Sequence, residues 1–153
     1  MEVKIQKIGK IINGYAFDSK LFNNADVGLP ITRIRDITRG YSATYYSGEY
    51  PEEYIIDNGA LLIGMDGEFN IEHWRGGKAL LNQRVCRVIP DAKKVDETFL
   101  KYRLRILLKE IEADTPYVTV KHLSSEKFKK AKIFLPPLPE QKRIAAQLAQ
   151  ADR

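Results

Sequence analysis

The sequence has little of what metal sites, disulfide frameworks and membrane proteins require. Its single cysteine, Cys86, excludes an internal disulfide framework and a cysteine-rich zinc site. The two histidines, His73 and His122, stand far apart, so we expect no metal ligand set. No run approaches the roughly 20 apolar residues of a membrane span, and the N-terminus lacks a signal-peptide core. We therefore expect no membrane association and a cytoplasmic location.

The motifs of cofactor-dependent and hydrolytic enzymes are also missing. Gly77-Lys78 resembles the end of a phosphate-binding loop, but Glu72 stands where the first glycine of that loop is required. Cys86 lies in an apolar segment and is interpreted as a small buried residue, not a nucleophile. The acidic residues near Asp57 and Asp66 flank turns, where aspartate is common for backbone reasons. We predict no catalytic residue and no cofactor in this chain.

The 153 residues, 44% of them hydrophobic, fit one globular domain with or without an appendage. The 25 basic residues exceed the 20 acidic ones only slightly, but their distribution is uneven. Residues 49–74 carry seven acids and no Lys or Arg, residues 75–109 carry ten bases, and residues 121–132 carry five lysines. If the basic segments share a face they would attract a polyanion; the alternative is that they are solvated surfaces.

Hydrophobic patterns predict an α+β fold built on a mixed, mainly antiparallel sheet with a few helices. Turn signals at Asn13-Gly14, Asp57-Asn58-Gly59, Asp66-Gly67 and Gly76-Gly77 separate the strands. The DG and GG turns favour an antiparallel meander, with 79–89 as a long central strand. The predicted strands cover residues 3–12, 31–37, 60–65, 68–75, 79–89 and 131–135.

Three helices are predicted in the second half of the chain. The first covers 96–112, with Asp96 as its cap and a leucine stripe facing the core. A short one begins at Ser124 or Ser125, and the last begins near Pro139 and reaches Arg153 without a stop signal. One side of the last helix is expected to contact a partner helix, or else the domain itself, through Ile144, Leu148 and Ala151. Its other side is expected to expose Gln141, Arg143 and Gln147.

Several segments together resemble the specificity subunits of type I restriction–modification systems. The most specific is LPPLPEQKRIA (135–145), which resembles the family's junction between recognition domain and long helix. Supporting segments occur in the family's order: GYAFDSKLF (14–22), LPITRIRDI (29–37), GALLIGMDGEF (59–69) and ALLNQRVCRV (79–88). The resemblance covers nearly the whole chain. It implies a target recognition domain over 1–137 and the start of a spacer helix over 138–153.

The resemblance also implies a function. Such a subunit is non-catalytic and reads one half of a bipartite site in double-stranded DNA. Partner methyltransferase subunits methylate adenine with S-adenosylmethionine, and motor–nuclease subunits perform restriction. A second recognition domain would be supplied in the same chain or by dimerisation. Two alternatives stay open: the recognition part of a single-chain restriction–methyltransferase fusion, and a protein-docking module acting through the C-terminal helix.

DNA readers combine cations on phosphates with polar side chains at base edges. Phosphate contacts are expected from the lysines Lys78, Lys127, Lys129, Lys130 and Lys132. Arg33 and Arg35 share a strand face that lines a DNA groove or covers the sheet. Asn82-Gln83-Arg84 could bond to base edges if exposed, but the predicted strand 79–89 turns alternate residues inward.

Base contacts are expected mainly from loops held by the sheet. The first loop, 39–46, offers Arg39, Ser42, Thr44, Tyr45 and Tyr46, although one of the two tyrosines is expected in the core. The second, 115–122, offers Tyr117, Thr119, Lys121 and His122, with His122 as an alternative capping residue. The third, 70–78, offers Asn70, Arg75 and Lys78, while Trp74 is expected in the core.

Overall fold

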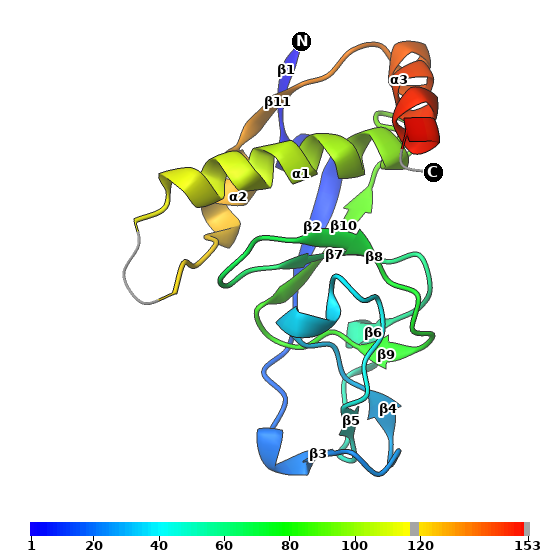
Figure 1. Ribbon diagram of the computed structural model, residues 1–153, viewed down its shortest axis with the longest axis vertical. Coiled ribbons are helices and arrows are strands. Elements are labelled where there is room, and N and C mark those ends of the chain that lie inside the picture. The colour runs from blue at the N-terminus through cyan, green and yellow to red at the C-terminus, as the bar shows by residue number, and fades with distance from the viewer. Residues whose placement is uncertain (117–119, 152–153) are drawn as a thin grey trace.

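A computed structural model describes residues 1–116 and 120–151 (Figure 1). The described residues form the helices α1 (Glu97–Asp114), α2 (Ser125–Lys130) and α3 (Leu138–Ala151). Their strands are β1 (Glu2–Lys4), β2 (Gly9–Asn13), β3 (Phe22–Asn23), β4 (Leu29–Pro30), β5 (Tyr45–Tyr46), β6 (Ile55–Ile56), β7 (Leu61–Gly64), β8 (Ile71–His73), β9 (Ala79–Leu80), β10 (Val85–Pro90) and β11 (Lys132–Phe134). Among the described residues, no helix has the length and apolar character to cross a membrane.

The central sheet has the strand order β2-β10-β7-β8, with antiparallel pairs throughout. It is covered on both faces, by α1 on one side and by the small sheets on the other (Figure 1). In β10, Cys86 and Val88 belong to the core between the sheet and α1. Val85 belongs to a second core, on the side of the small sheets. Burial on both faces explains why the β7 segment is apolar throughout and not alternating.

The helix α1 confirms the predicted helix 96–112 and its cap. The Asp96 carboxylate accepts a hydrogen bond from the Phe99 backbone N–H at 2.9 Å. The predicted leucine stripe is buried, as Leu100 and Leu104 show at 0% exposure. Glu72 on β8 fixes the helix to the sheet edge by ion pairs with the helix residues Lys101, at 2.9 Å, and Arg105, at 3.0 Å. The predicted starts of α2 and α3 and the strand at 131–135 are also confirmed.

The prediction of one strand over 3–12 is wrong. A 3-10 turn at Ile5–Lys7 divides the segment into β1, which pairs with β11, and β2, which pairs with β10. Ile5 is fully buried, and its backbone N–H donates to the Ala131 carbonyl. This long-range contact lets the chain pass from one sheet to another.

The predicted strand over 31–37 is also wrong, because a 3-10 turn occupies Ile34–Asp36. Asp36 is 0% exposed and accepts hydrogen bonds from the Arg33 backbone N–H and the Arg39 guanidinium. A buried carboxylate needs such partners, and they are available only if the chain turns here. Ile31, just before the turn, still makes an isolated bridge with Leu80.

The predicted central strand 79–89 is two strands in two different sheets. β9 pairs with β6, whereas β10 pairs with β2 and β7. Between them Arg84 has φ of +64°, a left-handed conformation that ends strand pairing. Of the predicted meander, the β7–β8 hairpin is confirmed, but the third strand is misplaced, because β10 pairs with β7 and β2 and not with β8.

The first turns of α3 pack against α1 and the core, which corrects our prediction for Gln141. Gln141 is 1% exposed: its side-chain oxygen accepts from the Asp96 N–H at 2.8 Å, and its amide donates to the Lys94 and Pro136 carbonyls. Ile144 packs against the domain's own core, as the alternative reading expected. Ala151 is exposed. The helix is thus tied to the cap of α1 at its start, whereas Ala151 at its last described position faces solvent.

Replacing Gln141 by alanine is expected to leave three partly buried backbone groups unpaired. We expect the Gln141→Ala variant to lose about 2–3 kcal/mol in the free energy of unfolding, measured with urea. Gln147→Ala, on the exposed side of the same helix, is the matched control, with a change within roughly 0.5 kcal/mol. Equal losses in both variants would contradict the role assigned to Gln141.

Candidate nucleic-acid interface

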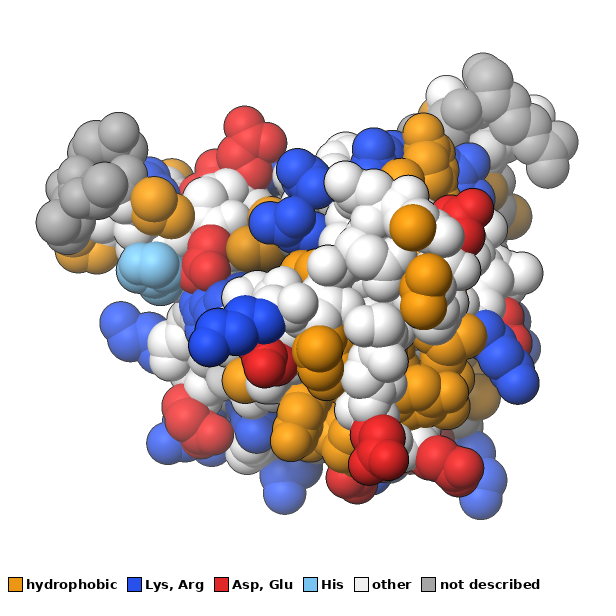
Figure 2. All heavy atoms as spheres, turned by 90° about the horizontal axis from the view of Figure 1, so that it is seen from below, with side chains coloured by type: hydrophobic (Ala, Val, Ile, Leu, Met, Phe, Trp, Pro, Cys, Tyr) orange, Lys and Arg blue, Asp and Glu red, His pale blue; other side chains and the backbone are white. Residues whose placement is uncertain are grey.

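A hollow of about 430 Å³ opens where the lower small sheets meet the turn between β9 and β10. Three arginines and one aspartate contribute to its wall, together with two amide side chains and two phenylalanines. The full lining is Phe17, Ser19, Phe22, Arg33, Ile34, Arg35, Asp66, Asn82, Gln83 and Arg84. The view of the molecule from below shows lysine and arginine side chains mixed with acidic ones, beside an exposed histidine (Figure 2).

The turn at residues 82–84 is held rigidly by its backbone. The Gln83 N–H donates to the Tyr15 carbonyl at 2.8 Å, and the Tyr15 N–H donates to the Leu81 carbonyl at 2.9 Å. The Gly14 N–H donates to the Val85 carbonyl at 2.9 Å. On the interior side of the turn, the buried Thr32 hydroxyl accepts a hydrogen bond from the Asn82 N–H at 3.2 Å. The turn is therefore clamped on both sides by segments distant in sequence.

Arg84 secures the turn through its side chain. Its guanidinium donates to both carboxylate oxygens of Asp66 at 3.0 Å and to the Met65 carbonyl at 3.0 Å. His122 Nδ1 also lies within hydrogen-bonding distance of Asp66. Burial opposes ionisation of Asp66, but the hydrogen bonds and charges of Arg84 and His122 outweigh it and lower the pKa of the carboxyl. This acidic side chain in the hollow is thus neutralised by its neighbours.

Two arginines and one glutamine on the wall of the hollow remain available to a ligand. Arg33, Arg35 and Gln83 are exposed, and their side chains make no hydrogen bond or ion pair to another described residue. Asn82 lies deeper, at 9% exposure, and its Oδ1 is buried without a hydrogen-bond partner in the described part of the chain. Guanidinium groups suit phosphates, and carboxamides suit base edges.

The loop 39–46 contributes less than the sequence predicted. Ser42 and Thr44 are buried: the Ser42 hydroxyl donates to the Ile31 carbonyl at 2.7 Å and accepts from the Thr44 N–H. Tyr46 is also buried, with its ring 4.9 Å from that of Phe17. These three side chains fill the interior of the loop. The prediction that they contact DNA is therefore wrong.

Tyr45 and Arg39 of this loop reach the surface but have protein partners. A hydrogen bond to Asp26, together with the charge of that residue, raises the pKa of the half-exposed Tyr45. Arg39 pairs with Asp36 and lies over the Tyr41 ring at 4.8 Å. Arg75 is exposed and donates to the Arg39 carbonyl at 2.8 Å. Both arginines therefore make contacts that stabilise the loop 39–46.

The loop 115–122 is described only in part, and Tyr117 and Thr119 lie outside the described residues. Lys121 is half-buried and donates to the Glu112 carbonyl at 2.8 Å near the end of α1, so its ammonium group already has a partner in the protein. His122 is exposed at the edge of the hollow's Asp66.

The other predicted contacts are dispersed. Lys78, Lys127, Lys130 and Lys132 are exposed, whereas Lys129 is half-buried and pairs with Glu126 at 3.5 Å. Asn70 is half-buried, and its side-chain oxygen accepts from Lys109 of α1 at 3.4 Å. The structure therefore brings Arg33 and Arg35 together at the hollow, with His122 at its edge, but not the remaining predicted residues.

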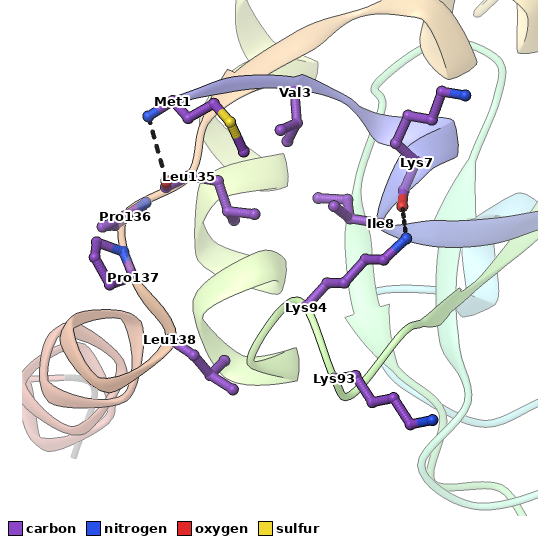
Figure 3. A pocket seen from close by; sticks show the side chains of 10 residues that line it. All are labelled: Met1, Val3, Lys7, Ile8, Lys93, Lys94, Leu135, Pro136, Pro137 and Leu138. Atoms are coloured by element: carbon purple, nitrogen blue, oxygen red, sulfur yellow. Dashed lines mark hydrogen bonds between the residues drawn. The ribbon is translucent and has the colours of Figure 1, made fainter.

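A larger hollow of about 640 Å³ lies between β1, the 136–138 segment and the 93–94 loop (Figure 3). Apolar side chains such as Val3, Ile8 and Leu138 form most of its wall. Lys94 is already engaged, since its Nζ donates to the Lys7 carbonyl at 3.1 Å. With few free donors, this surface does not suit the DNA backbone.

Sequence reasoning gave too little weight to Gln83 and Arg84. Apolar residues on both sides of Asn82-Gln83-Arg84 favoured a continuous strand, which hid the turn. The only local signal was a run of three polar residues inside that apolar segment. In the described part of the chain, no group of three His, Cys, Asp or Glu residues is arranged to hold a metal ion.

Comparisons with known proteins agree on one family. The family model for the type I restriction modification DNA specificity domain matches residues 1–153. The EcoBI specificity subunit of a type I restriction enzyme from Escherichia coli is 44% identical over 148 residues, or 97% of this chain and 31% of that protein. The chain thus spans about a third of that relative's length.

Solved structures share the fold. A chain from a structural study of complex assembly and conformational transition in the type I R-M system has a TM-score of 0.80 at 21% identity, over 99% of this chain and 38% of that one. The HsdS subunit from Thermoanaerobacter tengcongensis has a TM-score of 0.75 at 20% identity, over 98% and 36%. These likenesses support the mixed α+β architecture with its C-terminal helix.

The lowered pKa of Asp66 predicts a pH-dependent contribution to stability. Because the folded pKa lies below the unfolded value of about 3.9, the carboxylate stabilises the fold above that pH. This contribution is lost as the pH falls through the folded pKa. We expect Asp66→Asn to cost about 1–2 kcal/mol in the free energy of unfolding near pH 6–7.

Urea unfolding of both proteins between pH 3 and pH 7 would test this. The difference between wild type and Asp66→Asn should shrink below about pH 4. Glu49→Gln, at an exposed acid that makes no ion pair within the described residues, is the control and should leave unfolding nearly unchanged. A difference independent of pH would contradict the assignment.

Proposed function

The chain belongs to the family of type I restriction modification DNA specificity domains, and from this premise we propose that it binds double-stranded DNA sequence-specifically. It acts as one recognition domain of a non-catalytic specificity subunit, on DNA in the cytoplasm. Residues 1–137 form the recognition domain, and 138–153 begin a spacer helix. The domain reads one half of a bipartite target, and a second recognition domain, in the same chain or in a dimer, reads the other half.

The proposal extends to the partner subunits. Methyltransferase subunits guided by the bound domain methylate adenine, and motor–nuclease subunits cut DNA that lacks the methyl groups. S-adenosylmethionine belongs to the methyltransferase subunit, and this chain contributes only DNA-contacting and docking side chains. The exposed end of α3, with Ala151 outward and Leu148 half-buried, leaves an apolar strip for a helix of the same assembly.

The hollow beside the 82–84 turn is the observation that carries the proposal. It combines two free guanidinium groups, from Arg33 and Arg35, with an exposed carboxamide on a rigid turn. Guanidinium groups bind phosphates and supply salt-dependent affinity, while the carboxamide offers sequence choice. The one carboxylate of the hollow, Asp66, is neutralised by Arg84. Nothing in this arrangement needs catalysis by the chain itself.

Removing the two free arginines is expected to weaken binding to every DNA sequence. In an Arg33→Ala/Arg35→Ala variant, the plot of log affinity against log salt should become shallower by about 1.8 units, since each lost phosphate contact removes about 0.9. The measurement is fluorescence titration of duplex DNA at several salt concentrations.

A charge-matched control separates this effect from a general change in net charge. Lys142→Ala/Arg143→Ala removes the same charge from the exposed side of α3 and should leave the salt slope nearly unchanged. Equal effects of the two double variants would contradict an interface at the hollow. Wild-type chain that fails to bind any duplex at low salt would contradict the DNA-binding function.

A further inference from the structure

We propose that Gln83 is the residue that selects one base pair of the DNA half-site, by pairing its carboxamide with an adenine in the major groove. The inference rests on the proposed DNA-binding function and adds a specificity-determining residue to it. Among the described residues that line the hollow, Gln83 is the one exposed carboxamide, and its side chain has no protein hydrogen bond. A carboxamide without a protein partner, in a hollow that arginines also line, is available to a base edge.

The backbone under Gln83 is fixed before any ligand arrives. Its N–H donates to the Tyr15 carbonyl, and the next residue, Arg84, has a φ of +64° that non-glycine residues seldom adopt. Arg84 keeps this conformation because its side chain donates to Asp66 and to the Leu123 carbonyl. The backbone keeps an unfavourable conformation at Arg84, and such strain is common where a functional side chain must be held in a fixed position. Here that side chain is Gln83.

The neighbouring Asn82 is the second carboxamide of the turn. It is 9% exposed, lines the same hollow, and its Oδ1 has no donor among the described residues. Because this oxygen is buried, Asn82 cannot present its carboxamide to a ligand in the way that the exposed Gln83 can. Of the two adjacent carboxamides on this turn, only that of Gln83 is therefore available to DNA.

The chemistry of the side chain selects the base. A carboxamide has one donor and one acceptor side by side, which match the N7 acceptor and the N6 amino donor of adenine. Guanine presents two acceptors at the same edge, so Gln83 would satisfy only one of them. Arg33 and Arg35, which also line the hollow, are then free to hold the phosphates that set the position.

The test uses the 153-residue chain and a library of duplexes with a randomised centre at low salt. Sequencing of the bound fraction gives the preferred half-site for wild type, for Gln83→Met and for Gln147→Met as the control on the exposed side of α3. Methionine keeps the length of glutamine but has no amide donor or acceptor. Competition with single-base variants of the selected site then measures discrimination at each position.

We expect Gln83→Met to lose discrimination at one A·T position by about 5-fold to 150-fold, with the other positions and the salt slope unchanged. Gln147→Met should select the wild-type sequence. An unchanged half-site in Gln83→Met overturns the inference, as does an equal loss of affinity for all sequences, which would make Gln83 a contact to the DNA backbone. In both cases wild-type binding still stands. Wild type that selects no sequence overturns the proposed function and this inference together.

Discussion

Gly14 lies so close to the turn at Asn82 that a Cβ atom on it would stand 1.8 Å from the Asn82 carbonyl oxygen. Any side chain at this position would push the two segments apart. The approach allows the hydrogen bonds from Gly14 and Tyr15 to the Leu81–Val85 segment, which lock the turn that carries Gln83. The geometry of the interface therefore depends on one missing methyl group in a segment almost 70 positions away in the chain.

The sheet divides the molecule into two layers with different tasks. Above it, the core under α1 and the first turns of α3 hold the rod-like part of the chain in place. Below it, smaller cores around Trp74 and Phe17 support the loops and turns that form the hollow. Because β7 and β10 are packed on both sides, the lower surface is attached to a rigid body, as recognition by fixed loops requires.

The sequence predicted the elements that local chemistry determines. The cap at Asp96, the leucine spacing after it and the prolines before α3 act within a few residues, and these helices were correctly placed. The breaks at Ile5 and Arg84 depend on partners such as Ala131 and Asp66, which sequence periodicity does not reveal. A strand was therefore predicted wherever apolar residues were continuous.

The candidate site followed the same division. Arginines are rarely buried, so Arg33 and Arg35 were correctly expected at the surface, although on a turn and not on a strand. Small hydroxyl residues give no such signal, and Ser42 and Thr44 proved to be internal. Gln83 was obscured by its apolar neighbours.

Gln141, expected outside, was the residue that joins α3 to the domain. In a subunit built as proposed, that joint leaves the helix no freedom to swivel against the domain. Since duplex DNA turns once in about 10–10.5 base pairs, such a stiff joint would fix both the distance and the angular phase between two half-sites, so that a gap one base pair longer or shorter would rotate the second half-site by about a tenth of a turn away from its reader.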